Sequence, residues 1–266
     1  MKNPDVVRTP ELLHPTAIID PDARIASTAQ IGPYTVIGPG VEIGERVKIG
    51  PHAFVERDTR VSDDCRIGSG AVLGTDPQDL KYAGETTFLE IGPRTVIREY
   101  ATLNRGTAVS GKTVVGADSL IMAYAHVAHD CRIGDHVVLA NAVNMGGHVE
   151  IDDWAIVGGV TAIHQFVRIG CHSFVGGGSR LPQDVAPYVM VAGNPCTAYG
   201  LNTVGLRRRG FSRESLDALR FAYRTIFQSD HNVRQALAVV EAQEDRFEEV
   251  DRLINFIRLS RRGITT

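Results

Sequence analysis

Residues 31–50 read "IGPYTVIGPGVEIGERVKIG", and an isoleucine recurs in this stretch at every sixth position. A period of six differs from the 3.6 of an amphipathic helix and from the 2 of a half-buried strand. It indicates short strands that are joined by tight corners, each with one aliphatic side chain pointing inward. The frame consists of Leu13, Ile19, Ile25, Ile31, Ile37, Ile43, Ile49, Val55, Val61, Ile67 and Leu73, and it resumes with Ile91, Ile97, Leu103, Val109, Val115, Ile121, Val127, Ile133, Leu139, Met145, Ile151, Val157, Ile163, Ile169, Val175 and Leu181.

A coil built from such hexapeptides is a parallel β-helix, one of the repeat architectures that a fixed period identifies. The frame fails over residues 74–90, where we expect a loop that leaves the coil. Near residue 201 glycine becomes rare and helix formers dominate. We therefore expect a β-helix over 1–200 and a small helical domain over 201–266, with Asn232 as a helix N-cap and a last helix over about 246–259.

The composition is that of an ordinary globular protein, with 43% hydrophobic and 22% charged residues and a net charge of −3. This charge argues against a nucleic-acid partner. No apolar run approaches the roughly 18 residues of a membrane span, and the amino terminus, "MKNPDVVRTPELL", lacks the apolar core of a signal peptide. Four cysteines without CxxC spacing suggest a reducing compartment, so we expect a cytoplasmic protein.

Six of the nine histidines fall between His126 and His172. If three hexapeptides close one coil, residues eighteen apart stack on neighbouring rungs, about 4.8 Å apart. The sequence then predicts two columns that meet at one corner, together with His164 beside them. One column contains His129, Gly147 and Gln165, and the other contains Asp130 and His148.

Three interpretations of this corner are open on the residues alone. Solvent-exposed corners tolerate histidine without any function. Alternatively, His126, His129 and His148 could bind zinc, as three histidines do in hexapeptide-fold carbonic anhydrases. In the third interpretation His129 is a general base, because a neighbouring aspartate can hold its ring in the tautomer that exposes a basic nitrogen.

Several motifs occur in one order along the chain: "HPTAII", "QDLKYAGE", "NRGT", "AHVAHDCRIGDHVVLAN", "GGHVEIDDWAIVGG", "TAIHQF" and "RRRGFSRE". In this combination the chain resembles the family of acyl-[acyl-carrier-protein]–UDP-N-acetylglucosamine O-acyltransferases, from His14 to the last helices. The resemblance implies a left-handed, three-sided β-helix that uses no metal or other cofactor. It also implies transfer of a (3R)-3-hydroxyacyl group from acyl carrier protein to the sugar 3-hydroxyl of UDP-N-acetylglucosamine, the first step of lipid A biosynthesis.

The resemblance also implies roles for individual residues. His129 matches the general base, Asp130 the residue that orients it, and the Gly147 N–H the donor to the oxyanion. Gly177 matches the position that gauges acyl length, where the lack of a side chain favours a longer chain. The remaining matches contact the substrates: His126, His148 and His164; Gln165 near nucleotide and pantetheine; Asp79 and Lys81 at the sugar nucleotide; and Asn202, Arg208 and Arg209 near uracil and phosphate.

Some positions depart from the family pattern and leave acceptor contacts in doubt: Val204 replaces an expected acidic residue, Pro195 stands where a histidine can occur, and Ala123 and Tyr124 stand where bulkier aliphatic and amide residues can occur. Residues 201–266 carry 12 Arg and 9 acidic residues, which suits docking of an acidic carrier protein. Flat sides and a projecting loop predict a homotrimer with sites between subunits. The rival functions are a related N-acyltransferase of lipid A synthesis, a zinc-dependent hydratase and a non-enzymatic scaffold.

Overall fold

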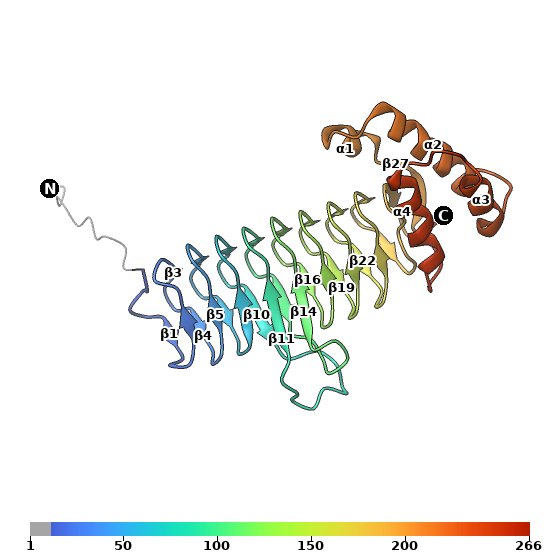
Figure 1. Ribbon diagram of the computed structural model, residues 1–266. Coiled ribbons are helices and arrows are strands. Elements are labelled where there is room, and N and C mark those ends of the chain that lie inside the picture. Colours follow the sequence, from blue (N-terminus) through green and yellow to red (C-terminus); the bar gives the residue numbers. More distant parts are fainter. Residues whose placement is uncertain (1–11) are drawn as a thin grey trace.

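The computed structural model describes residues 12–266, in which three sheets form the sides of a left-handed parallel β-helix (Figure 1). Residues 1–11, where we expect no signal peptide, lie outside the described part. The nine-stranded sheet contains β1 (Ile18–Ile19), β4 (Val36–Ile37), β7 (Phe54–Val55), β10 (Val72–Thr75), β13 (Thr102–Asn104), β16 (His126–Val127), β19 (Asn144–Met145), β22 (Ala162–Ile163) and β25 (Arg180–Leu181). The eight-stranded sheet contains β2 (Arg24–Ile25), β5 (Glu42–Ile43), β8 (Thr59–Val61), β11 (Phe88–Ile91), β14 (Lys112–Val115), β17 (Arg132–Ile133), β20 (Glu150–Ile151) and β23 (Arg168–Ile169). The ten-stranded sheet contains β3 (Gln30–Ile31), β6 (Lys48–Ile49), β9 (Arg66–Ile67), β12 (Val96–Ile97), β15 (Leu120–Ile121), β18 (Val138–Leu139), β21 (Ile156–Val157), β24 (Phe174–Val175), β26 (Val189–Ala192) and β27 (Thr197–Leu201).

The aliphatic frame forms the core of the coil. Within a regular coil the strands pair in parallel at a spacing of eighteen residues, so that Ile19 lies beside Ile37 and Ile133 beside Ile151. Most frame residues from Ile31 to Leu181 are almost completely buried. Burial of one such side chain contributes about 1.5–3 kcal/mol, and the column repeats this contribution on every rung.

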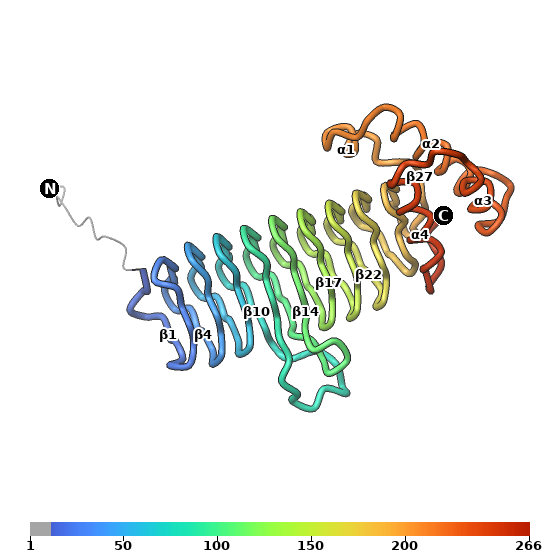
Figure 2. Tube along the Cα trace, in the orientation of Figure 1, coloured from blue at the N-terminus to red at the C-terminus, as the bar shows by residue number. Residues whose placement is uncertain are grey.

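Two segments leave the coil, and the sequence predicted only one of them. The loop expected over 74–90 is shorter than that, because β10 extends to Thr75 and β11 begins at Phe88. The second excursion spans 105–111 and contradicts the inward place given to Val109, whose surface is 79% exposed. Leu103 pairs with Val127, 24 residues later, so the insertion preserves the period of six and the frame conceals it. Both segments project from the same edge of the β-helix on successive rungs, one between β10 and β11 and the other between β13 and β14 (Figure 2).

The corners between sheets are tight turns that point side chains outward. Asp130 (φ 61°) and His148 (φ 60°) stand at equivalent corners of successive rungs in the left-handed backbone conformation. This conformation costs about 1–2 kcal/mol for a residue with a side chain. Because the corner repeats in register, outward side chains of neighbouring rungs stack on each other.

Four helices follow the strands at one end of the coil: α1 (Thr203–Arg208), α2 (Arg213–Phe227), α3 (Val233–Glu241) and α4 (Glu248–Leu259) (Figure 1). Asn232 is the N-cap of α3 and forms a capping box with Gln235, as an N-cap asparagine can. The final helix begins at Glu248, two residues later than predicted. The carboxyl-terminal segment returns to the coil, where Thr265 N–H donates to the Asp184 carbonyl at 2.8 Å. The division into domains at residue 200 stays a prediction.

The outward faces of the sheets differ in chemistry. The eight-stranded sheet displays charges that pair along the coil, such as Arg60 with Glu90 and Arg168 with Glu150. The ten-stranded sheet instead displays a row of six apolar, partly exposed side chains on consecutive strands: Val96, Leu120, Val138, Ile156, Phe174 and Met190. Among residues 12–266, no helix has the length and apolar character that crossing a membrane requires.

Candidate active site

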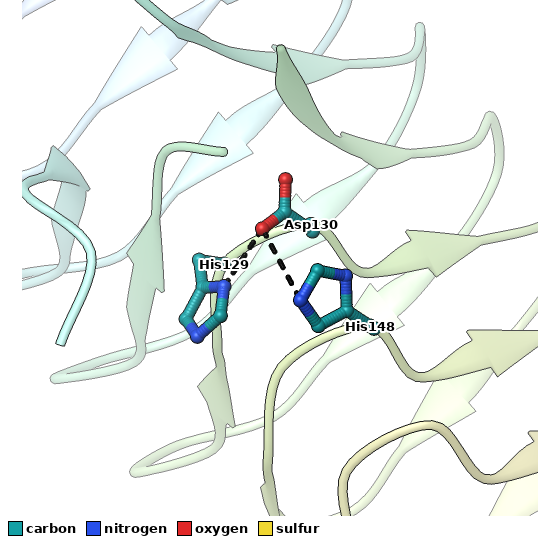
Figure 3. Close-up of side chains that lie close together, drawn as sticks. All are labelled: His129, Asp130 and His148. Atoms are coloured by element: carbon teal, nitrogen blue, oxygen red, sulfur yellow. Dashed lines mark hydrogen bonds and ion pairs between the residues drawn. The ribbon is translucent and has the colours of Figure 1, made fainter. Parts of the chain in front are cut away.

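His129 and Asp130 lie at the corner between β16 and β17, where the nine-stranded sheet meets the eight-stranded one (Figure 3). The Nδ1 atom of His129 is 2.8 Å from Oδ2 of Asp130, and the two side chains are 13% and 0% exposed. A hydrogen bond from Nδ1–H to the carboxylate places the lone pair of a neutral imidazole on Nε2. The pair can therefore present a basic nitrogen at the surface of the coil.

Asp130 is surrounded by donors. Its Oδ1 accepts from the Thr107 N–H at 2.9 Å and from the Ser110 hydroxyl, and its Oδ2 accepts from the Thr107 hydroxyl at 2.8 Å and from His129. Burial alone would raise the pKa of this carboxyl. The bonds from Ser110, His129 and Thr107 outweigh burial and lower the pKa to about 2, so the side chain is ionised at neutral pH.

The next rung places Gly147 and His148 beside this pair, as the predicted columns require. A methyl carbon on Gly147 would lie 2.6 Å from Nε2 of His129, so only glycine leaves room for the ring. Within residues 12–266, the Gly147 N–H donates to no backbone carbonyl. It is available to a bound ligand immediately beside the imidazole.

His148 contributes a second ring to the corner. Its Nε2 is 3.7 Å from Oδ2 of Asp130, and its ring meets that of His129 edge-on, with centroids 5.2 Å apart (Figure 3). Burial lowers its pKa, which favours the neutral ring. Phe166 stacks on the other side, at 4.5 Å between centroids. Sequence reasoning did not select Phe166, although its spacing of eighteen from His148 placed it in the same column.

His126, His164 and Gln165 lie on the same side of the coil. His126 points outward from β16 and shares a hydrogen bond with the Thr102 hydroxyl, with 2.8 Å between Nδ1 and Oγ1. Burial lowers the pKa of His126, and repulsion from His129 lowers it further. His164 and Gln165 are exposed at the corner one rung above Gly147. The structure thus gathers every histidine and glutamine that the sequence assigned to this corner.

The loop between β10 and β11 carries Asp79 and Lys81. The Lys81 N–H donates to Oδ1 of Asp79 at 3.0 Å, and the Lys81 side chain is exposed. Asp79 is close enough to His148 for their attraction to oppose the effect of burial on the pKa of that histidine. The loop therefore borders the corner that holds His129.

Asn202, Arg208 and Arg209 lie elsewhere in the same chain, at the edge between the eight- and ten-stranded sheets. Asn202 caps α1 and donates from Nδ2 to the His172 carbonyl at 2.9 Å. The Arg209 guanidinium lies over the Trp154 ring, 5.0 Å from its centroid. Arg208 ends α1 and is exposed. One chain alone does not bring these residues to His129.

Gly177 occupies the third edge, between β24 and β25, where the ten- and nine-stranded sheets meet. A methyl carbon built there would meet only glycine backbone nearby, at 3.2 Å from the Gly159 carbonyl oxygen, 3.6 Å from the Gly159 nitrogen and 4.0 Å from the Gly158 carbonyl carbon. The position therefore presents bare backbone at the surface. It too is separated within one chain from the edge that carries the dyad.

The corner also has the residue types of a metal site. His129, Asp130 and His148 each offer a ligand atom, and these atoms lie within 4.8 Å of one another. A carboxylate has about four acceptor positions, and the Asp130 side chain already accepts four hydrogen bonds from protein donors. Its lone pairs are committed, so this arrangement fits a hydrogen-bonded dyad better than a zinc ligand.

Comparisons with known proteins agree on one family. A family model described as "Udp N-acetylglucosamine O-acyltransferase; Domain 2" matches residues 184–265, and one for bacterial transferase hexapeptides matches 22–57 and 112–147. A relative from Burkholderia mallei, named acyl-[acyl-carrier-protein]–UDP-N-acetylglucosamine O-acyltransferase, is 48% identical over 203 residues, which cover 74% of this chain and 78% of the relative.

Solved structures show the same relationship. The structure of LpxA from Acinetobacter baumannii is 44% identical, with a TM-score of 0.94 and coverage of 96% of this chain and 100% of the other. The UDP-N-acetylglucosamine O-acyltransferase from Moraxella catarrhalis is 42% identical, with a TM-score of 0.91 and coverage of 96% and 100%. On this evidence the chain belongs to the acyl-[acyl-carrier-protein]–UDP-N-acetylglucosamine O-acyltransferase family and is a hexapeptide-repeat acyltransferase.

Proposed function

We propose that the protein transfers a (3R)-3-hydroxyacyl group from acyl carrier protein to the 3-hydroxyl of UDP-N-acetylglucosamine, the first step of lipid A biosynthesis, with His129 as general base. The observation that carries the proposal is the buried, ionised Asp130, which is hydrogen-bonded to Nδ1 of His129 beside the free N–H of Gly147. A base, its orienting group and an oxyanion donor are thus adjacent, as acyl transfer requires.

The reaction follows from these positions. Nε2 of His129 takes the proton of the sugar hydroxyl as the oxygen bonds to the thioester carbonyl carbon. The carbonyl oxygen becomes an oxyanion and accepts a hydrogen bond from Gly147, a type of contact typically worth about 10²–10³ in rate. The intermediate collapses, the carbon–sulfur bond breaks, and the imidazolium returns the proton to the leaving thiolate. Asp130 stays ionised and stabilises the imidazolium throughout.

The surrounding side chains suit an anionic sugar nucleotide and a pantetheine arm. His126, His148 and His164 surround the base and can contact both substrates, with Gln165 above them. Lys81 on the neighbouring loop can neutralise a diphosphate, while Asp79 can accept from sugar hydroxyls. Because Asn202, Arg208, Arg209 and Gly177 lie on other edges, their roles toward uracil, phosphate and acyl chain require a second subunit.

A homotrimer supplies that subunit. The edge with Gly177 and the edge with Arg209 both border the ten-stranded sheet. A neighbouring subunit that turns this sheet toward His129 therefore brings the residues of both edges toward the His129–Asp130 dyad. The apolar outer row of the same sheet, which includes Val138 and Ile156, has the chemistry of an interface core. The charged face of the eight-stranded sheet is suited to solvent. Cyclic closure of three subunits repeats one such contact three times.

The helical part is the proposed docking surface for the acidic carrier protein. The Arg213 side chain is 89% exposed, and Asp217 pairs both with Arg213, at 3.9 Å, and with Arg220. The four cysteines, Cys65, Cys131, Cys171 and Cys196, are all free thiols, which is consistent with the reducing cytoplasm.

Val204 is 58% exposed at the first turn of α1, so it offers an apolar surface where the family pattern has an acid.

A mass-resolved assay tests the function. Purified protein is given hydroxyacyl carrier proteins of graded length with UDP-N-acetylglucosamine or its 3-amino analogue, and product masses are recorded. We expect an ester product and a loss of at least about 10²-fold in turnover for His129→Ala. His52→Ala, at a corner far along the coil, is the matched control. Near-normal turnover of His129→Ala would remove the base assignment, and an amide product alone would show that the acceptor group is the 3-amine of the analogue and not the 3-hydroxyl. Absence of product from both acceptors would favour the related N-acyltransferase of lipid A synthesis, and activity restored only by added zinc would indicate metal chemistry.

A further inference from the structure

The second excursion of the chain, residues 105–111, lies directly against the proposed dyad. It leaves β13 after Asn104 and rejoins the coil at β14. Gly106 N–H donates to the Phe88 carbonyl at 3.2 Å, and Gly111 N–H closes the loop onto the Thr107 carbonyl at 2.8 Å. The segment is therefore anchored at both ends, and its side chains have defined places.

Two of these residues, Thr107 and Ser110, supply three of the four hydrogen bonds to Asp130, two from side-chain hydroxyls and one from a backbone N–H. Thr107 donates from its N–H to Oδ1 at 2.9 Å and from its hydroxyl to Oδ2 at 2.8 Å. The Thr107 hydroxyl also accepts from Val109 N–H at 3.2 Å, which leaves its proton for the carboxylate. The Ser110 hydroxyl lies between Oδ1 of Asp130 and the Lys112 carbonyl. A charged carboxylate is the stronger acceptor of its single proton.

A buried arginine ties the same segment to the loop that carries Asp79 and Lys81. Arg105 is fully buried and donates to the Gly74 carbonyl, to Asp76 and, at 3.3 Å, to the Tyr82 hydroxyl. A buried charge that is paired in this way is costly to displace, because breaking the pair leaves an uncompensated charge in the interior. The excursion is thus a rigid support.

We propose that Thr107 and Ser110 are positioning residues for acyl transfer, which act by holding the Asp130 carboxylate and, through it, the ring of His129. The inference rests on the proposed role of His129. Oδ2 is shared between the Thr107 hydroxyl and Nδ1 of His129, so the direction of the carboxylate decides where the imidazole stands. The hydroxyl donors also disperse the carboxylate charge and thereby moderate its pull on the His129 proton.

Loss of a donor has two separable consequences. The carboxylate becomes freer to rotate, which lowers turnover without removing a substrate contact. With one donor fewer, more of the Asp130 charge acts on the hydrogen bond to His129. This stabilises the protonated imidazole, so the acid limb of the pH–rate profile moves to higher pH. The other titratable groups at this corner are His126 and His148, which interact with His129, and Asp79, which interacts with His148; the substitution changes none of them.

The experiment compares Ser110→Ala with Ser110→Thr, which restores a hydroxyl at an exposed position where the extra methyl has room. For Ser110→Ala we expect kcat to fall about tenfold, consistent with one hydrogen bond to a charged group, with KM for UDP-N-acetylglucosamine within twofold of wild type. We also expect the acid limb of kcat/KM to move up by about half a pH unit, and Ser110→Thr to recover most of both effects. Thr107→Val and Thr107→Ser form a second matched pair.

The imidazole titration of His129, followed by NMR in the absence of substrate, tests the positioning independently of activity. A midpoint at higher pH in Ser110→Ala supports the inference even if His129 proves not to be the base. A wild-type rate and profile in Ser110→Ala would overturn it, and so would equal losses in Ser110→Ala and Ser110→Thr, which would indicate a merely structural effect.

Discussion

Gly147→Ala is the substitution whose consequence the structure specifies most closely. The new methyl carbon would lie 2.6 Å from Nε2 of His129 and 3.0 Å from Nδ1, and still closer to Cε1. Ordinary contacts begin near 3.4 Å, so clearing Nε2 requires the ring to recede by about 0.8 Å, and clearing Cε1 requires slightly more. The backbone of Gly147 is not in the left-handed region, so alanine itself is tolerated and the ring takes the whole displacement.

The displacement weakens the hydrogen bond from Nδ1 to Asp130 and also moves Nε2, the proposed basic nitrogen. Moved by this amount away from the carboxylate, Nδ1 would stand about 3.6 Å from Oδ2 of Asp130 instead of 2.8 Å, beyond hydrogen-bond range. A hydrogen bond to a charged group contributes about 1.5–3 kcal/mol, which corresponds to one to two orders of magnitude in rate. A reacting group misplaced by about 1 Å can itself lower the rate about 10²-fold. We therefore expect kcat to fall at least about 10²-fold.

Steady-state turnover with hydroxyacyl carrier protein measures the effect, and thermal unfolding shows whether the coil is intact. Gly200→Ala is the matched control, because its methyl would meet only Cε of Met190, at an ordinary 3.5 Å. A Gly147→Ala enzyme with turnover within threefold of wild type would refute the reasoning. It would mean that His129 can move without loss and is not the base.

Three further predictions concern acyl length, acid stability and assembly. Gly177→Met should shift preference toward shorter donors, because each excluded methylene forfeits about 0.8 kcal/mol; unchanged preference in the graded-length assay would contradict this. The pKa of Asp130, about 2, lies below the unfolded value of about 3.9, so its charge should stabilise the fold by about 2 kcal/mol above pH ~4 and lose this effect as pH falls toward 2. The free energies of unfolding in urea of wild type and Asp130→Asn should therefore differ at pH 7 and converge near pH 2. A difference that does not change with pH would contradict this prediction. Val138→Glu should dissociate the trimer in sedimentation, whereas a stable, active wild-type monomer would argue against the assembly.

The sequence by itself determined the coil. An inward aliphatic residue at every sixth position is a local rule repeated on each rung, and nothing distant can override it when every neighbour repeats it. The same regularity placed Gly147 over His129 and His148 over Asp130, since residues eighteen apart stack wherever no insertion intervenes. The capping box at Asn232 was likewise readable, because its partners lie three residues apart.

Only the tertiary structure revealed the excursion over 105–111. Its length preserves the phase of the repeat, so Val109 resembles a core residue in the sequence although it is exposed. The contacts of Thr107 and Ser110 with Asp130 join residues about twenty positions apart, and the neighbouring Arg105 bonds to Asp76 on the other loop. The position of Arg209 over Trp154, on another edge than His129, was decided in the same way. A periodic pattern shows which residues stack, whereas the direction of a side chain at a corner follows from packing that no local rule contains.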